Sequence, residues 1–181
     1  MQKRVVDPKA FFSMSYGLYI VGSHLGGKRN AQVANAVIQL TAEPVTMAVC
    51  LNKKNFTMEC LGDCGAFSVS VLEEDVPMTF IGRFGFKSGR DIDKFEGVGY
   101  ETGELGVPIV RDWCLSGFEA RVVDKVDVHT HVLFVGEVVS AGVFKEGKAL
   151  TYENYHLLKR GKAPVTAPTF AFNALTEKQK S

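Results

Sequence analysis

The sequence predicts a mainly β protein, built as a β-barrel with a few short helices. Three observations lead to this prediction. Segments rich in Val, Ile, Phe and Tyr recur along the chain, the two longest of them are joined by a short connection, and the helical patterns between them are brief. Long strands with few helices favour a barrel, because closure removes the exposed edges of a flat sheet.

Six segments are expected to form strands because of their β-branched and aromatic content. In chain order they are Tyr16–Val21, Asn30–Thr41, Thr46–Leu51, Ala66–Leu72, Trp113–Val126 and His131–Val143. Only the residues Asp127–Thr130 separate the last two segments, so these are expected to pair as a hairpin.

Short helices are predicted between the strands from start and stop signals. Asn55 can cap a helix that begins at Phe56 and ends at Gly62 or Gly65. Two further helices are expected, one from Pro77 to Gly85 and one from Asp91 to Gly97. A last helical turn is predicted over Tyr152–Lys159, followed by extended chain up to Phe170 because prolines recur there.

Length and composition limit the classes of protein that fit. The 181 residues suit one domain, which we place at residues 1–170 with a C-terminal tail at residues 171–181. The net charge of +1 is spread along the chain, so no nucleic-acid partner is expected. No apolar stretch is long enough to span a bilayer, and the start lacks the apolar core of a signal peptide. We therefore expect a cytoplasmic protein with no membrane partner.

The four cysteines and four histidines do not form a recognisable metal motif. No Cys-x-x-Cys pair exists, and free cysteines are typical of a reducing compartment. His129 and His131 can share one face of a strand, but no third ligand is evident, so we predict no metal site.

The segment Asn52–Thr57 combines two lysines, two asparagines and a threonine where a strand ends and a helix begins. Helix N-termini carry a partial positive charge and free N–H donors, so such a segment suits a phosphate group. An ordinary lysine-bearing turn with a helix cap explains the same residues. Further along, the segment 82–95 mixes glycines, cations and aromatics, including Arg90 and Lys94. That mixture suits either a phosphate with a flat aromatic ring or a solvated loop, and no Gly-x-Gly-x-x-Gly motif supports a Rossmann site.

Taken together, these segments resemble a known family. The motifs are Ala34–Pro44, Asn52–Thr57, Phe84–Phe95, His131–Val138 and Leu150–His156, in unbroken order. They resemble the flavin reductase-like, FMN-binding split-barrel proteins, and most of all the FMN domain of high-molecular-weight rubredoxins and the flavoredoxins. The resemblance implies a six-stranded FMN-binding split β-barrel that works as a homodimer, with two FMN sites completed at the dimer interface.

The resemblance also implies roles for particular residues. Four residues are expected to line the flavin ring: Asn35, Gln39, Leu40 and Thr41. The ribityl phosphate is expected to be held by Asn52, Lys53, Lys54, Asn55, Thr57 and Lys94, with Arg90 as a further cation close by. His131 corresponds to the family histidine beside the nicotinamide.

The implied activity is electron transfer from NAD(P)H through FMN to a flavin, iron or a protein acceptor. Two alternatives stay open: a flavin-binding electron carrier that does not itself oxidise NAD(P)H, and a ligand-binding barrel without redox chemistry. High-molecular-weight rubredoxins carry an iron-binding extension, whereas this chain has no Cys-x-x-Cys. A one-electron carrier such as rubredoxin is therefore expected to be a separate molecule.

Overall fold

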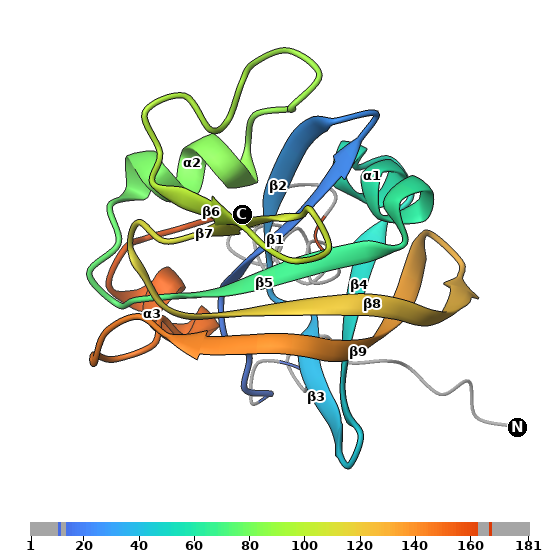
Figure 1. Ribbon diagram of the computed structural model, residues 1–181. Coiled ribbons are helices and arrows are strands. Elements are labelled where there is room, and N and C mark those ends of the chain that lie inside the picture. The colour runs from blue at the N-terminus through green and yellow to red at the C-terminus, as the bar shows by residue number, and fades with distance from the viewer. Residues whose placement is uncertain (1–10, 12–13, 163–166, 168–181) are drawn as a thin grey trace, which may run out of the picture.

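A computed structural model describes Phe11, residues 14–162 and Ala167. The centre of this part is one antiparallel sheet of seven strands in the spatial order β2-β1-β5-β8-β9-β4-β3 (Figure 1). Its strands are β1 (Tyr19–Leu25), β2 (Lys28–Ala34), β3 (Val37–Ala42), β4 (Val45–Asn52), β5 (Ala66–Leu72), β8 (Cys114–Val128) and β9 (His131–Val143). A separate two-stranded ribbon pairs β6 (Tyr100–Thr102) with β7 (Pro108–Val110).

The sheet curls so that its two edges meet. Strands β2 and β3 lie at opposite edges of the sheet, yet only Asn35 and Ala36 separate them in the chain. The Ala36 carbonyl accepts a hydrogen bond from Cys50 N at 2.9 Å, which ties this connection to β4. The two edge strands, β2 and β3, are therefore joined by the covalent chain, and no hydrogen-bonded ladder between them is found among the described residues. A barrel left open between two strands in this way is a split barrel.

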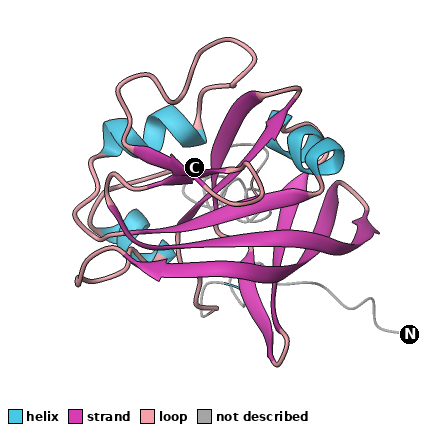
Figure 2. Ribbon diagram, in the orientation of Figure 1, coloured by secondary structure: helices cyan, strands magenta, loops and turns pink. Residues whose placement is uncertain are grey.

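Three short helices lie at the margins of the sheet (Figure 2): α1 (Phe56–Cys64), α2 (Met78–Gly85) and α3 (Tyr152–Leu157). Two apolar clusters form the core. One lies among the strands around Phe67 and Phe134. The other joins α2 and α3 to the sheet around Phe84, Phe95 and Tyr155.

Several predicted elements are confirmed. Strands β5 and β9 have the predicted bounds, and the β8–β9 hairpin forms, with a turn at His129 and Thr130. Helix α1 ends at Gly65, whose φ of 67° is in the left-handed region and whose N–H bonds to Leu61 O. The mainly β fold class is confirmed, and the main sheet has seven strands because the predicted strand over residues 30–41 forms two.

Two predictions about elements are wrong, and one pair of strands was missed. The single strand over residues 30–41 is two strands, because the chain crosses from one edge of the sheet to the other at Asn35. No helix forms over residues 91–97. There the Asp93 carboxylate accepts from Phe95 N, and the Lys94 side chain turns inward, so this segment is a series of turns. The ribbon of β6 and β7 was not predicted, since each strand has only three residues.

Most of the predicted extended segment, and all of the predicted tail at residues 171–181, lie outside the described residues. Among the residues that are described, no helix combines the length and apolar character needed to cross a membrane.

Candidate functional site

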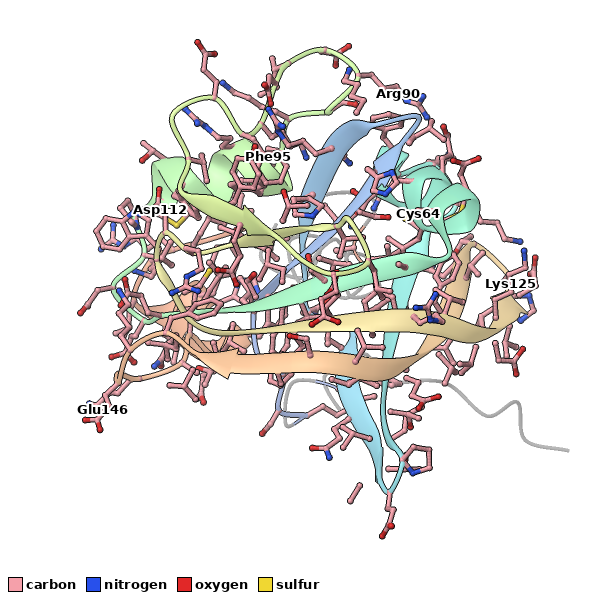
Figure 3. The ribbon with its side chains drawn as sticks, viewed as in Figure 1. Cys64, Arg90, Phe95, Asp112, Lys125 and Glu146 are labelled. Carbon is pink, nitrogen blue, oxygen red and sulfur yellow. The ribbon has the colours of Figure 1, made fainter. Side chains whose placement is uncertain are left out.

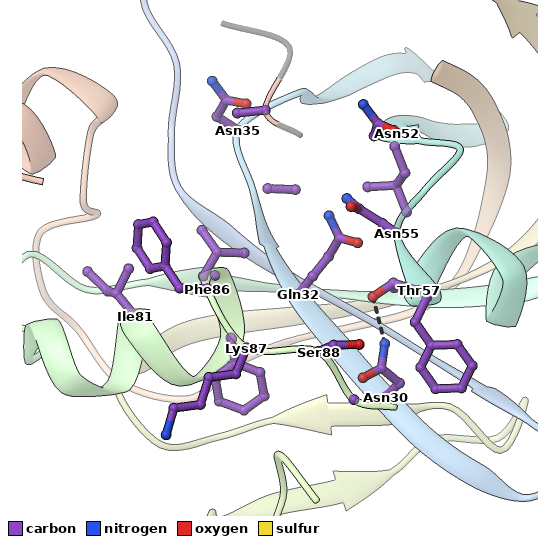
Figure 4. A pocket seen from close by; sticks show the side chains of 18 of the residues that line it. Asn30, Gln32, Asn35, Asn52, Asn55, Thr57, Ile81, Phe86, Lys87 and Ser88 are labelled. Carbon is purple, nitrogen blue, oxygen red and sulfur yellow. Dashed lines mark hydrogen bonds between the residues drawn. The ribbon is translucent and has the colours of Figure 1, made fainter. Parts of the chain in front are cut away.

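A pocket of about 560 Å3 opens where five parts of the fold meet (Figure 4). It is lined by strand β2, the end of β4, the first turn of α1, the end of α2 with the loop that follows, and α3. This volume lies in the range typical of cofactor and small-ligand sites. The two segments singled out in the sequence, Asn52–Thr57 and the loop after Phe84, both contribute to it. Tertiary structure thus brings the two candidate segments to one cavity.

The charged lining of the pocket has one sign. Lys54, Lys87 and Lys94 line it, and no aspartate or glutamate is among the described lining residues. Amide and hydroxyl side chains supply most of the remaining polar groups, and apolar side chains such as Leu18, Phe84 and Phe86 cover other walls. A ligand with an anionic end and an apolar, flat body matches such walls.

The first turn of α1 forms one end of the pocket. Asn55 is the N-cap residue, but its side chain makes no capping hydrogen bond. Met58 N donates to Asn55 O, so the N–H groups of Phe56 and Thr57 are those that keep their donor capacity. The Asn52 Oδ1 atom accepts from Lys54 N at 3.0 Å, which shapes the turn before the helix. Thr57 is buried and accepts a hydrogen bond at its Oγ1 atom from Asn30 Nδ2 at 2.8 Å. These features suit an anion.

Lys94 lies deeper than a surface phosphate ligand. Its residue is only 4% exposed, and its Nζ donates to Ala31 O at 2.8 Å and to Phe84 O at 3.1 Å. Burial lowers the pKa of the Lys94 ammonium to about 8. The ammonium thus ties β2 to the end of α2, and one of its three N–H donors is left over for the pocket.

Two buried amide atoms in the lining have no hydrogen-bond partner within the described part of the chain: Asn30 Oδ1 and Asn35 Nδ2. Buried polar groups are normally paired, so unpaired ones in a cavity indicate a place for a polar ligand or water. Cys50 also lines the pocket, and burial raises the pKa of its thiol.

The predicted site residues divide into two sets. Those that line the pocket are Asn35, Asn52, Lys54, Asn55, Thr57 and Lys94. The others do not line it in this chain. Lys53 forms an ion pair with Asp127, and Arg90 pairs with Glu59 and lies over the Phe56 ring. Figure 3 shows Arg90 at the outer rim of the molecule.

The remaining predicted residues lie on β3 and β9. Gln39, Leu40 and Thr41 are exposed on β3, away from the pocket of this chain. His131 lies directly opposite Asn52 in the β4–β9 ladder. Its Nδ1 atom is 2.8 Å from Thr130 Oγ1, while its buried Nε2 atom has no partner in the described part of the structure.

Sequence reasoning missed Asn30 and Gln32, which line the pocket from β2. A signal for them existed, because polar residues two positions apart in a strand point to the same face. Tyr152 and Tyr155 were also given no role, although both line the pocket from α3. These tyrosines lie far in sequence from the other lining residues, so no local sequence motif connects them with the pocket.

The chain is similar to known proteins over most of its length. Residues 11–159 match the flavin reductase like domain family. The chain is 52% identical over 165 residues to a ferric-chelate reductase (NAD(P)H) of Archaeoglobus fulgidus, covering 91% of this chain and 98% of that protein. It is 46% identical over 165 residues to a high molecular weight rubredoxin of Moorella thermoacetica, covering 91% of this chain and 72% of that protein.

Solved structures support the same assignment. The flavoredoxin of Methanosarcina acetivorans is similar with a TM-score of 0.69 at 26% identity, covering 82% of this chain and 81% of that chain. An NADH:FAD oxidoreductase of Streptomyces globisporus shares the fold alone, with a TM-score of 0.73 at 21% identity and coverage of 85% and 95%. The predicted split-barrel fold and the predicted oxidoreductase class are confirmed. This chain belongs to the flavin reductase-like domain family.

Proposed function

We propose that this protein binds FMN in the 560 Å3 pocket and transfers electrons from NAD(P)H to a flavin, a ferric complex or a carrier protein. The observation that carries the proposal is the pocket lining: three lysines, no described carboxylate, and the first turn of α1 beside an apolar wall. A monophosphate suits the cationic end, and a flavin ring suits the apolar walls. When bound, FMN supplies hydride acceptance and one-electron transfer.

The residues of the pocket have separate tasks in this proposal. Lys54, the Thr57 hydroxyl and the N–H groups at the start of α1 hold the phosphate. Asn35 supplies an amide donor, Nδ2, that is buried and unpaired among the described residues, and we assign it to the polar edge of the ring. Phe84 and Leu18 exclude water from one side of the pocket.

We further propose that a second copy of the chain covers the outer face of β3, β4, β8 and β9. Directly opposed residues in a sheet share a face. One row is Cys50, Leu133 and Val126, and the next is Asn52, His131 and Val128. Cys50 and Asn52 also line the pocket, so this apolar face is continuous with it. A partner on the face would close the pocket, which supports a flavin site at the seam of a homodimer.

The exposed β3 residues Gln39, Leu40 and Thr41 belong to the same proposal. They lie outside the pocket of their own chain, so a contact with the flavin ring requires the second copy. His131 shares a face with Asn52, and we assign it to the nicotinamide end of the site.

The acceptor is proposed from the two relatives. The Archaeoglobus relative is named a ferric-chelate reductase (NAD(P)H), which supports ferric chelates as acceptors. The Moorella relative is named a high molecular weight rubredoxin, which supports a rubredoxin-like protein as a separate carrier. All four cysteines are free, in accord with the reducing cytoplasm that we propose as its location.

The decisive experiment is an absorption spectrum of the purified protein before and after anaerobic NADH or NADPH. The protein should be yellow, release FMN on denaturation and lose its visible absorption when the nicotinamide is added. Release of FAD, or no flavin uptake on reconstitution, would contradict the FMN assignment. Bound FMN that neither nicotinamide reduces would instead indicate an electron carrier, and a colourless protein that takes up no flavin would indicate a barrel without redox chemistry.

A further inference from the structure

The hydrogen bond between Asn30 and Thr57 fixes which of the two groups donates (Figure 4). Asn30 Nδ2 lies 2.8 Å from Thr57 Oγ1, and both residues are 1% exposed and line the pocket. An amide N–H can only donate, so the threonine oxygen accepts. The hydroxyl hydrogen of Thr57 must then point in another direction.

The pocket is open to that hydrogen, because Thr57 is among the residues that line it. No other described residue forms a hydrogen bond with the Thr57 hydroxyl, and Thr57 lies in the first turn of α1 near Lys54. A buried hydroxyl group normally donates its hydrogen as well as accepting at its oxygen, so this hydrogen needs an acceptor. An anion at this end of the pocket would provide that acceptor.

We propose that Asn30 is a positioning residue for the cofactor phosphate, which holds the Thr57 hydroxyl as a donor toward the anion. This inference rests on the proposed function, because it requires a phosphate beside the first turn of α1. In this inference Asn30, on β2, does not contact the phosphate. It acts only by fixing the direction in which the Thr57 hydroxyl hydrogen points.

The loop after α2 passes close to the Asn30 side chain at Gly89. A Cβ atom at Gly89 would lie 1.9 Å from Asn30 Oδ1 and 2.8 Å from Asn30 Cγ. No side chain fits at Gly89 without moving the amide, so a residue other than glycine there would displace Asn30 from Thr57. Lys94, which bonds to the carbonyl of the neighbouring Ala31, anchors the same part of β2.

The inference is tested by the affinity for FMN relative to riboflavin, which lacks the phosphate. A merely structural link between β2 and α1 would affect both ligands alike. In Asn30→Asp the carboxylate accepts from the Thr57 hydroxyl and so turns the oxygen lone pairs toward the phosphate. Fluorescence titration at pH 8 should show the Kd for FMN raised about 30-fold or more, and that for riboflavin changed by less than about threefold.

Two further variants separate charge from proton direction. In a Thr57→Val background there is no hydroxyl whose direction Asn30→Asp could reverse. The increase that Asn30→Asp causes in the Kd for FMN should then be smaller by about fivefold or more, because only the repulsion between the added charge and the phosphate remains. Asn30→Ala adds no charge and should raise the Kd for FMN by about 3- to 10-fold while the Kd for riboflavin is unchanged. An equal Asn30→Asp effect in both backgrounds would overturn the inference.

Gly89→Ala tests the same geometry from the loop, with Gly82→Ala as its control. A Cβ at Gly82 meets nothing within 4 Å, so this variant should retain the FMN preference of the wild type, whereas Gly89→Ala should lose it.

If the wild-type protein binds FMN and riboflavin equally, the phosphate site of the proposed function fails, and the inference with it. If the wild type prefers FMN about tenfold but the Asn30 and Gly89 variants keep that preference, only the inference fails.

Discussion

Asn52 and His131 are direct cross-strand neighbours on β4 and β9, yet only Asn52 lines the pocket. Opposed residues share a face of the sheet, so the imidazole lies beside the pocket rather than within it. Its Nδ1 atom is engaged with Thr130 Oγ1, and its Nε2 atom has no partner among the described residues. This unpaired ring nitrogen is the observation behind the role proposed for His131.

The first prediction concerns hydride transfer. His131→Ala should slow anaerobic flavin reduction by NAD(P)H about a hundredfold, because a misplacement of about 1 Å in the reacting atoms has an effect of that size. Flavin content and melting temperature should stay near the wild-type values, as measured by absorbance and thermal unfolding. His129→Asn, in the neighbouring turn at a φ of 52°, is the matched control and should reduce at the wild-type rate. Parallel loss of flavin and stability in His131→Ala would make the histidine structural.

The second prediction concerns the phosphate. Lys54→Ala combined with Thr57→Ala should weaken FMN binding tenfold or more, because charge-assisted hydrogen bonds contribute about 1.5–3 kcal/mol each. Calorimetric titration of the apoprotein measures the change. Lys53→Ala is the control, since the Lys53 ammonium is paired with Asp127 outside the pocket and should have little effect. Unchanged affinity in the double variant would move the phosphate toward Lys87 and Lys94, the other lysines of the pocket.

The third prediction concerns the dimer. Ile38 is 62% exposed on β3, one of the strands of the proposed interface. Ile38→Asp would place a charge in the proposed interface, so the dimer dissociation constant should rise about 100-fold or more, with weaker FMN binding. Light scattering coupled to size exclusion provides the mass. Leu157→Asp, at a leucine that is 69% exposed on α3, should remain a dimer. A wild-type monomer that binds FMN tightly would contradict a shared site.

The fourth prediction uses the buried lysine. The pKa of Lys94 is about 8 in the folded protein, against 10.5 for an ordinary lysine side chain. Between these values the unfolded state binds more protons than the native state, so the free energy of unfolding rises with pH. Relative to Lys94→Met, the free energy of unfolding of the wild-type apoprotein should rise by up to about 3 kcal/mol from pH 8 to pH 10.5. Below pH 7 this difference between the two proteins should not change with pH. Urea unfolding across this range measures the difference, and parallel curves for the two proteins would contradict it.

Local patterns in the sequence were sufficient for most of the elements. The strands β5 and β9 and the start of α1 follow from β-branched content and cap residues, which act over a few neighbours. The phosphate-suited segment Asn52–Thr57 could be found for the same reason, since its residues are consecutive. The strand break at Asn35 could not, because both halves of that segment have strand composition and only the curl of the sheet separates them.

The sequence by itself therefore determined the fold class, the family and one wall of the pocket. Tertiary structure decided which of the charged candidates line it. Lys53 and Arg90 carry the same charge as Lys54, but Asp127 and Glu59 reach them only after folding and hold them outside the pocket. Tertiary structure also brought Asn30 to Thr57 across 27 residues of sequence, and a contact of that kind depends on how strand β2 packs against helix α1, which no local pattern records.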